Sequence, residues 1–573
     1  MIRATRFAAA SLVALLALFA PGLAFADEQP VSPCVATDEQ CAAYAEDGTL
    51  EARSAFQENL GNDEPSAGLV QQAIAREQAN NGIATNAVPG DDSGMALAGK
   101  AHVLALRVSF PDQTFAEGDT LEALQALIGP RSEGEAALPS AGPFPYENLH
   151  DYYQRASYGK LSITGEAFDY QAQHERAYYA TNIGSLFSEA LAYLDGQTNL
   201  GRFDANGDGR IDAVYLHFAG PDTGWGSVWW SNEQVFGAET ATYANGAVRL
   251  WNGVALANPC DQAWAAQTII HETGHVLGLP DFYDYLSQKG GATSRTGILT
   301  FDMMMQNQGD HNGFSKWMLG WLPESKVTRV FANEDGIDVK RDGQVVEHVD
   351  AAPDGSSSIE EALSAFTSDD LKETGGIIVV SNEDKGTGMF SSYYLLQYDQ
   401  FASNQSVYYE SGGQSTQIPS GFRLFRVQAD IGEGGGLLHS NTAGTVHNQL
   451  IELVDPDMGV AHANGTLTVP TAIGATAYGC MLFAGDQMTP AGYPSTNFYE
   501  NINVGFTGLT FAVTESGAEA GRVSISYSDA DKPATPRTSR SRPPSTASRT
   551  WTRSRSTRRP SRCSPQRFRR RCS

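Results

Sequence analysis

The spacing of apolar residues predicts strands in two regions of the chain. In HVLALRVSF, residues 102–110, Leu104, Leu106 and Val108 occupy every second position, as in a strand with one buried face. DAVYLHFAG, residues 212–220, has the continuous apolar pattern of a buried strand. After about Leu322, short β-like runs alternate with turn residues, namely GGIIVVS, SYYLLQYDQF, GFRLFRVQAD, LTVPTA and GLTFAVTE…GRVSISYS.

Helical spacing occurs between these strands. YENLHDYYQRASYGKL (146–161) predicts one helix, and SLFSEALAYLD (185–195) predicts another, in which Phe187, Leu191 and Leu194 recur at helical intervals. A third helix is expected before Gly278, which would end it. Helices followed by a strand-rich region indicate the α+β class. We divide this part of the sequence into residues 98–330 and a β-rich part, 331–528.

The N-terminus predicts an exported protein. Arg3 and Arg6 precede an apolar run from Phe7 to Ala20, and AFA at 24–26 is a small-residue cleavage site. Residues 1–26 are therefore interpreted as a signal peptide, with the mature chain starting at Asp27 and secreted. The run has 14 residues, fewer than the roughly 20 needed to span a membrane, so no membrane span is expected after signal removal.

Residues 27–97 are polar and acidic, with little apolar material for a core. GLVQQAIAREQANNG (68–82) is the one helical stretch we expect here. We interpret this region as a pro-region or linker, which would keep a secreted enzyme latent by covering its cleft.

Charge separates the C-terminal tail from the rest. From Pro533 onward the chain carries 13 arginines and no acidic residue, whereas all 66 acids lie before it together with the other 26 basic residues. The acidic body argues against nucleic-acid binding by that part. Residues 529–573 form an Arg/Ser/Pro-rich low-complexity tail. Three interpretations stay open: a disordered extension, a reading-frame artefact, or a segment that binds polyanions.

Six cysteines are consistent with disulfides in an exported protein. The simplest pairing joins Cys34 to Cys41, Cys260 to Cys480, and Cys563 to Cys572. Alternatively, Cys34 or Cys41 would supply a thiolate to a metal ion elsewhere in the chain and block the position that a water would occupy.

The stretch IIHETGHVLGLPDFYDY, starting at Ile269, carries the candidate chemistry. His271 and His275 lie four residues apart, so on a helix they share one face and can bind one metal ion. Glu272 lies beside that face, where it can reach a water on the metal. Zinc with three protein ligands keeps one position for water and lowers the pKa of that water, and Glu272 would then act as general base.

A third ligand is expected just after the helix. Gly278 allows a sharp turn that returns Asp281 toward the metal, in the pattern HExxHxxGxxD. Asp284 is the alternative third ligand. Tyr283, Tyr285 and His311 are candidate donors to a developing oxyanion.

These residues resemble a known family. HETGHVLGLPDFYDY is similar to the active-site helix of the immune inhibitor A family of secreted bacterial zinc metallopeptidases, which are related to the metzincins. The resemblance extends from about Lys100 to Ser528 through LHDYYQRASYGKLSITGEAFDY, FDMMMQNQGDHNGFSKWMLGWL and DQMTPAGYPSTNFYENI. It implies a zincin, metzincin-like catalytic domain with a twisted sheet and an active-site helix, and endopeptidase activity on proteins. It also implies a methionine beneath the zinc, for which Met304 is the best match.

A second metal site is predicted at DANGDGRID, residues 204–212. Asp204, Asn206, Asp208 and Asp212 offer oxygen ligands on a tight loop, as calcium prefers. A full EF-hand would have a glutamate where Tyr215 stands, and polar turns also favour these residue types, so an ordinary turn is the alternative.

The sequence therefore predicts a secreted zinc-dependent endopeptidase acting on protein or peptide substrates. Two alternatives stay open: a non-catalytic adhesion or binding protein on a decayed protease fold, and a zinc amidase that acts on cell-wall peptides.

Overall fold

The computed structural model describes most of residues 36–530. Outside the described residues lie 1–35, 37, 81–93, 131–147, 258–259, 261–263, 284, 286–297, 299–301, 366–374, 383–387, 443–448, 455–459, 462–466, 469–480, 491–497 and 531–573, with several shorter gaps. The predicted signal peptide and the arginine-rich tail both fall outside, and so does Asp284. Contacts between residues separate Pro533–Ser573 from the rest of the chain.

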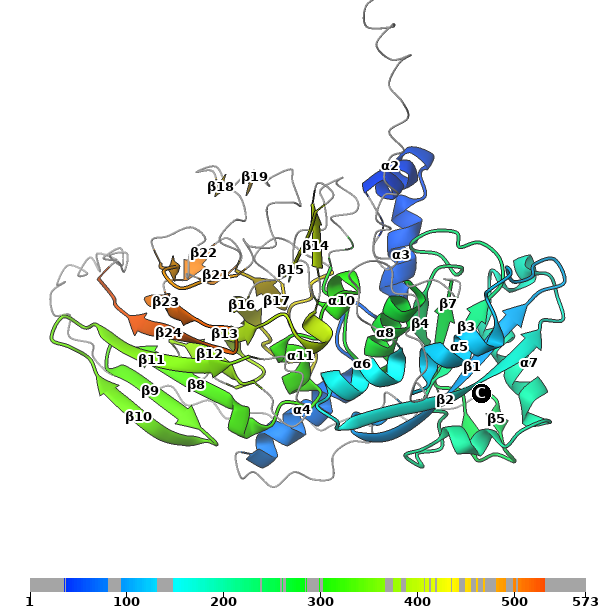
Figure 1. Ribbon diagram of the computed structural model, residues 1–573, viewed down its shortest axis with the longest axis horizontal. Coiled ribbons are helices and arrows are strands. Elements are labelled where there is room, and N and C mark those ends of the chain that lie inside the picture. The colour runs from blue at the N-terminus through cyan, green and yellow to red at the C-terminus, as the bar shows by residue number, and fades with distance from the viewer. Residues whose placement is uncertain are drawn as a thin grey trace, which may run out of the picture. The chain divides into compact units, whose positions relative to one another are not determined.

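A five-stranded mixed sheet forms the first half of the described chain (Figure 1). Its order is β2 (Leu161–Gln171), β1 (Gly99–Ser109), β3 (Val214–Phe218), β7 (Asn252–Leu256) and β4 (Asn232–Val235). The first four strands are parallel, and β4 pairs antiparallel with β7 at the edge. The predicted strands at 102–110 and 212–220 are confirmed as β1 and β3.

Both faces of this sheet are covered, so β1 buries more than its alternation predicted. Leu104 and Leu106 belong to one apolar cluster, whereas Val103 and Ala105 belong to another on the opposite face. Helix α7 (Ile183–Asp195) packs in the first cluster, and helices α5 (Leu121–Ile128), α6 (Leu149–Ala156) and α8 (Trp264–Val276) pack in the second. A parallel sheet covered on both sides gives strands without a polar face.

Polar caps fix where three of these helices begin. The side chains of Thr120, Asn148 and Asn182 accept hydrogen bonds from the backbone of the first turns of α5, α6 and α7. Each side chain satisfies a backbone N–H that has no partner within the helix. The predicted helices over 146–161 and 185–195 are thus confirmed, the first in a shorter form.

The second half is β-rich, as predicted. A seven-stranded sheet has the order β10 (Gln344–Asp350), β9 (Gly336–Arg341), β8 (Val327–Asn333), β12 (Ile377–Ser381), β13 (Ser392–Asp399), β16 (Gly421–Gln428) and β17 (Ile451–Leu453). A four-stranded sheet has the order β11 (Ser357–Ser364), β24 (Ala520–Tyr527), β23 (Leu509–Ser516) and β20 (Gln487–Met488). One apolar cluster draws side chains from both sheets, so they pack face to face. Mixed helix and strand with twisted sheets agrees with the α+β class.

Short elements complete the described chain. Two-stranded pairs are β5 (Thr242–Tyr243) with β6 (Val248–Arg249), β14 (Tyr408–Ser411) with β15 (Gln414–Gln417), β18 (Val460–Ala461) with β19 (Leu467–Thr468), and β21 (Phe498–Glu500) with β22 (Asn503–Gly505). Short helices are α10 (Met303–Gln306) and α11 (Gly313–Met318), with 3₁₀ turns at Arg176–Tyr179, Leu200–Phe203, Glu324–Lys326 and Ser403–Gln405.

The N-terminal region contributes more to the core than its composition predicted. It forms α2 (Asp38–Asp47), α3 (Leu50–Leu60) and α4 (Ala67–Asn80), and we call residues 38–80 the N-terminal segment. Leu50, Leu69 and Ala73 are buried in the same apolar cluster as α8 and the inner strands of the seven-stranded sheet. In Figure 1 α3 lies above α8 and β4, and residues of α3 contact β4.

The apolar cluster around α8 also crosses the boundary that we drew at residue 330. It includes Tyr393, Phe425 and Ile451 of the β-rich part. The N-terminal segment, the α8 region and the β-rich part therefore share one core. Among the described helices, we find none whose length and apolar character would suffice to cross a membrane.

Candidate active site

Helix α8 and the turn after it bring three candidate metal ligands together. His271 Nε2 and His275 Nε2 lie 3.1 Å apart, and Asp281 Oδ1 lies 3.1 Å from the first and 3.4 Å from the second. All three side chains are buried. The structure thus places the three predicted ligands at one point, with Gly278 at φ +90° reversing the chain between His275 and Asp281.

The spacing of these atoms fits zinc. Bonds of 2.0–2.1 Å in a tetrahedral site hold neighbouring ligand atoms about 3.3 Å apart. The three measured separations lie close to that value. Asp281 Oδ1 has no hydrogen-bond partner among the described residues, as expected for an atom that faces a cation.

The remaining polar atoms of the ligands are held by neighbours. His271 Nδ1 donates to Met303 O and His275 Nδ1 donates to Leu279 O, each at 2.8 Å. These bonds leave both Nε2 lone pairs directed at the common point, as in known metal sites. The Tyr285 hydroxyl donates to Asp281 Oδ2 at 2.5 Å, so Tyr285 supports the carboxylate ligand rather than facing a substrate.

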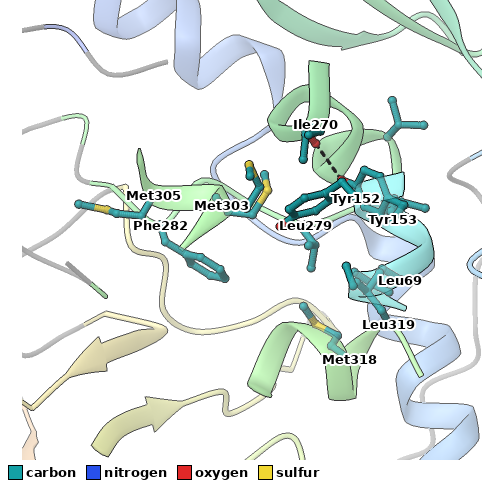
Figure 2. Packing of buried hydrophobic residues seen from close by; sticks show 14 of the residues in the cluster. Leu69, Tyr152, Tyr153, Ile270, Leu279, Phe282, Met303, Met305, Met318 and Leu319 are labelled. Atoms are coloured by element: carbon teal, nitrogen blue, oxygen red, sulfur yellow. Dashed lines mark hydrogen bonds between the residues drawn. The ribbon is translucent and has the colours of Figure 1, made fainter. Parts of the chain in front are cut away.

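The turn that contains Met303, Met304 and Met305, which we call the methionine turn, lies against α8, the helix that carries His271 and His275. Met303, Met304 and Met305 are all fully buried. Figure 2 shows Met303 and Phe282 among the buried side chains of the apolar cluster around α8. A Cβ added to Gly274 would overlap Met304 Sδ, so this helix position must be glycine for Met304 to pack there. Asp302 accepts from Met304 N and from Asn312 Nδ2, each at 2.9 Å, which fixes the turn. Met304 therefore packs against Gly274 of α8, and its place beneath a zinc ion stays a prediction.

The charges of the three candidate ligands favour a positive charge between them. Burial opposes the charged form of His275, but the Asp281 carboxylate outweighs it and raises the pKa of His275 to about 9. Burial likewise opposes ionisation of Asp281, yet His275 and His271 hold its pKa below the ordinary value. A group of two imidazoles and one carboxylate with these properties favours a cation at its centre.

Two glutamates lie near the ligands. Glu272 is buried and lines the same cavity as His271, His275 and Asp281. Glu233, on edge strand β4, is also buried, and its Oε1 has no hydrogen-bond partner among the described residues. Burial raises the pKa of Glu233 to about 8, with His275 lowering and Glu272 raising it. No local sequence pattern distinguishes Glu233 from other glutamates.

The structure separates the three candidate oxyanion donors. Tyr283 lines the cavity with the metal ligands. Tyr285 is bound to Asp281, as described above. His311 lies behind α8, among the rings of Tyr152, Tyr153 and Trp321 at 5.8–6.0 Å. Burial lowers the pKa of His311 to about 3, and its role as an oxyanion donor stays a prediction.

The N-terminal segment covers this cavity. Gln57 of α3 and Asn62 line it together with Ser231 and Asn232 of the β4 edge. The remaining space is about 10 Å³, room for about one water molecule. The cavity therefore has no room for a molecule much larger than water while the segment is in place.

Backbone hydrogen bonds fix the segment to the ligand loop. Asp281 N donates to Asn62 O at 2.8 Å, and Ser66 N donates to Gly278 O at 2.9 Å. A Cβ on Gly278 would overlap Ser66 Oγ, so this glycine both reverses the chain and admits the segment. The segment lies within residues 27–97, which the sequence predicts as a pro-region or linker, and a role in latency stays a prediction.

The predicted calcium loop is ordered by its own backbone. Asp204 Oδ1 accepts from Gly207 N at 2.7 Å and from Asp208 N at 3.0 Å, whereas Asp212 Oδ2 accepts from His102 N at 2.6 Å. Burial, with the charges of Asp204 and Asp208, raises the pKa of Asp212 to about 7. The groups of converging ligand atoms found among the described residues do not include this loop. Calcium binding remains a prediction.

A second buried group combines Asp119, His217 and Cys260. His217 Nε2 and Asp119 Oδ2 are 2.7 Å apart, and His217 Nδ1 lies 3.2 Å from Leu256 O. A separation of 2.7 Å is that of a charge-assisted hydrogen bond and is shorter than the spacing of zinc ligands. The atoms of His271, His275 and Asp281 therefore match the spacing of metal ligands more closely than those of the second group.

The cysteine predictions fall largely outside the described residues, which include neither Cys34 nor Cys480. Cys41 is buried in α2, and its thiol donates to Ala36 O at 3.9 Å. No cysteine is among the described residues that line the cavity, so the thiolate alternative would depend on Cys34.

Comparisons with known proteins add no assignment. The sequence matched no protein-family model, and a search of curated proteins returned no match either. The function therefore has to be argued from the residues of the site.

Proposed function

We propose that this protein is a secreted, zinc-dependent endopeptidase of zincin type, made as a precursor in which the N-terminal segment covers the active site. The convergence of His271, His275 and Asp281 at zinc spacing, with Glu272 beside them, carries the proposal. The donor set fits zinc because it offers two imidazole nitrogens and one carboxylate oxygen at tetrahedral separations. When bound, zinc would act as a Lewis acid and activate a water for attack on a peptide carbonyl.

The residues of the chain have separate tasks in this scheme. His271, His275 and Asp281 hold the metal, and Met303 O, Leu279 O and Tyr285 orient them. Glu272 takes a proton from the attacking water and returns it to the leaving amine. Tyr283 is the candidate donor to the developing oxyanion, because it lines the cavity without the role that Tyr285 has.

The proposal is tested by two substitutions in the processed protein. Glu272→Gln should keep one zinc per chain, because Glu272 is not a ligand, and should lower casein cleavage by about 10²–10⁴-fold. His275→Ala should lose both zinc and cleavage. Metal content is measured by elemental analysis, and cleavage with a labelled casein. Normal cleavage by Glu272→Gln would contradict the assigned role.

The same experiment distinguishes the two alternatives. A binding protein on a decayed protease fold would hold zinc in the wild type but cleave neither casein nor peptides. A zinc amidase would release fragments from cell-wall peptides and leave casein intact. Glu272 at the ligand cavity favours the endopeptidase over the first alternative.

A further inference from the structure

Three backbone carbonyl groups in the loop between β3 and β4 converge on one arginine of the N-terminal segment. Arg53 Nη1 donates to Gly224 O at 3.2 Å and to Trp225 O at 2.6 Å, and Nη2 donates to Thr223 O at 3.1 Å. A guanidinium is planar and carries its N–H groups in fixed directions. We call residues 222–226 the carbonyl loop.

The carbonyl loop is shaped for close approach by a cation. Gly224 and Gly226 have φ values of +84° and +67°, a conformation that lets consecutive carbonyls turn to one side. A Cβ on Gly226 would overlap the backbone of Arg53. Asp222 Oδ1 accepts from Gly224 N at 3.1 Å, which holds the turn and adds a negative charge beside it.

The carbonyl loop adjoins the metal site. The ring of Trp225 lies 6.1 Å from that of Tyr285, which holds the ligand Asp281. Arg53 and Gln57 lie one turn apart on α3, a rise of about 6 Å, and Gln57 lines the cavity of the metal ligands. A side chain of a peptide bound at the metal could therefore reach the position that Arg53 occupies.

We propose that the carbonyl loop is a specificity subsite for an arginine side chain of the substrate, which Arg53 fills in the precursor. This inference rests on the proposed function and names a substrate class for it. When the N-terminal segment leaves, Thr223 O, Gly224 O and Trp225 O lose their common donor. A substrate arginine restores all three hydrogen bonds, whereas the ammonium of lysine, a point charge, matches the planar arrangement less well.

The test is a cleavage profile of the processed wild-type enzyme on a peptide library. We expect arginine to be enriched at one position relative to the scissile bond. In a single peptide, replacing that arginine by citrulline, which is neutral and of the same shape, should lower kcat/KM about tenfold or more. Lysine should fall between the two.

Enzyme variants separate the carbonyl loop from the general negative charge of the protein. Asp222→Ala should reduce the preference for arginine over citrulline several-fold, because it removes the carboxylate beside the carbonyl loop. Asp350→Ala, which removes an exposed carboxylate of β10, should preserve the preference. Cleavage with no preference for arginine at any position would overturn the subsite and leave the endopeptidase standing. Absence of cleavage of every peptide would overturn both.

Discussion

At the scale of single residues, the most informative contact is the hydrogen bond from Tyr285 to Asp281. A carboxylate has two oxygens, and here one faces the imidazoles while the other accepts from a buried hydroxyl at 2.5 Å. The hydroxyl holds the carboxylate plane in the orientation that the metal needs. Such supporting partners are commonly worth 10–100-fold in metal affinity.

Tyr285→Phe should therefore bind zinc about 10–100-fold more weakly than the wild type. The measurement is competition with a chromophoric chelator. Tyr393→Phe is the matched control, because it removes another buried hydroxyl, bonded to Met389 O at 3.0 Å, away from the ligands. Equal affinity of the Tyr285→Phe variant and the control would refute this supporting role.

Sequence reasoning located the ligands but not their supports, for a physical reason. The spacing of His271, Glu272 and His275 is set by one helical turn, and Asp281 follows after a glycine, so all four are local in sequence. Tyr285 also lies in this stretch, yet its role depends on which oxygen of Asp281 it reaches. Gln57, Asn62 and Glu233 come from distant segments, and no local pattern indicates where such residues will pack.

At the scale of elements, α3 is the part of the N-terminal segment whose contacts would keep the proposed precursor inactive. Arg53 anchors it to the carbonyl loop, and the turn after it is bonded to Asp281 and Gly278. Helices α2 to α4 have little apolar surface of their own, so from sequence alone they resembled a linker. Their buried side chains pack in a cluster with α8 and strands of the seven-stranded sheet, which are distant in sequence.

Arg53→Ala should partly activate the unprocessed chain. The loss of hydrogen bonds from a charged group weakens docking by about 1.5–3 kcal/mol, which corresponds to about 10–100-fold more open molecules. Hydrolysis of a quenched fluorescent peptide measures the gain, with gel analysis to show that the chain stays uncut. Glu51→Ala, an exposed change on the same helix, is the control. Activity as low as that of the control would exclude Arg53 as an anchor.

At the scale of the whole molecule, the strands were predictable but the sharing of the core was not. Alternation and apolar runs identified β1, β3, β12, β13 and β16, because each of these strands carries its own apolar residues in a recognisable local pattern. The boundary drawn at residue 330 divides a sequence whose side chains meet in one cluster. We therefore expect the parts of the chain that share this cluster to unfold together, so that a change near the methionine turn alters the free energy of unfolding of all of them.

The pH dependence of the free energy of unfolding tests the burial of the Asp302 carboxyl group in the methionine turn. Asp302 is fully buried, and burial raises its pKa to about 6 in spite of hydrogen bonds from Met304 N and Asn312. In the unfolded chain the same carboxyl ionises near its ordinary value of about 3.9. Between these two values the unfolded state binds fewer protons, so this group makes the folded state less stable as pH rises.

Asp302→Asn removes this titration. The free energy of unfolding of the wild type minus that of the variant should fall by up to about 3 kcal/mol between pH 4 and pH 7, measured by urea unfolding at fixed zinc concentration. Asp350→Asn, an exposed change, should show no such trend. A difference that stays constant or rises with pH would contradict the assignment of the raised pKa to Asp302.

The burial of Leu50, Leu69 and Ala73 in the same apolar cluster as α8 affects how long the protein would stay folded after loss of the N-terminal segment. If the N-terminal segment is discarded on activation, the apolar surface that these side chains protected becomes open to water. We expect the processed form to denature faster than its precursor, and bound substrate to slow that decay. Under the proposed function, removal of the segment would therefore both open the active site and shorten the time for which the protein stays folded.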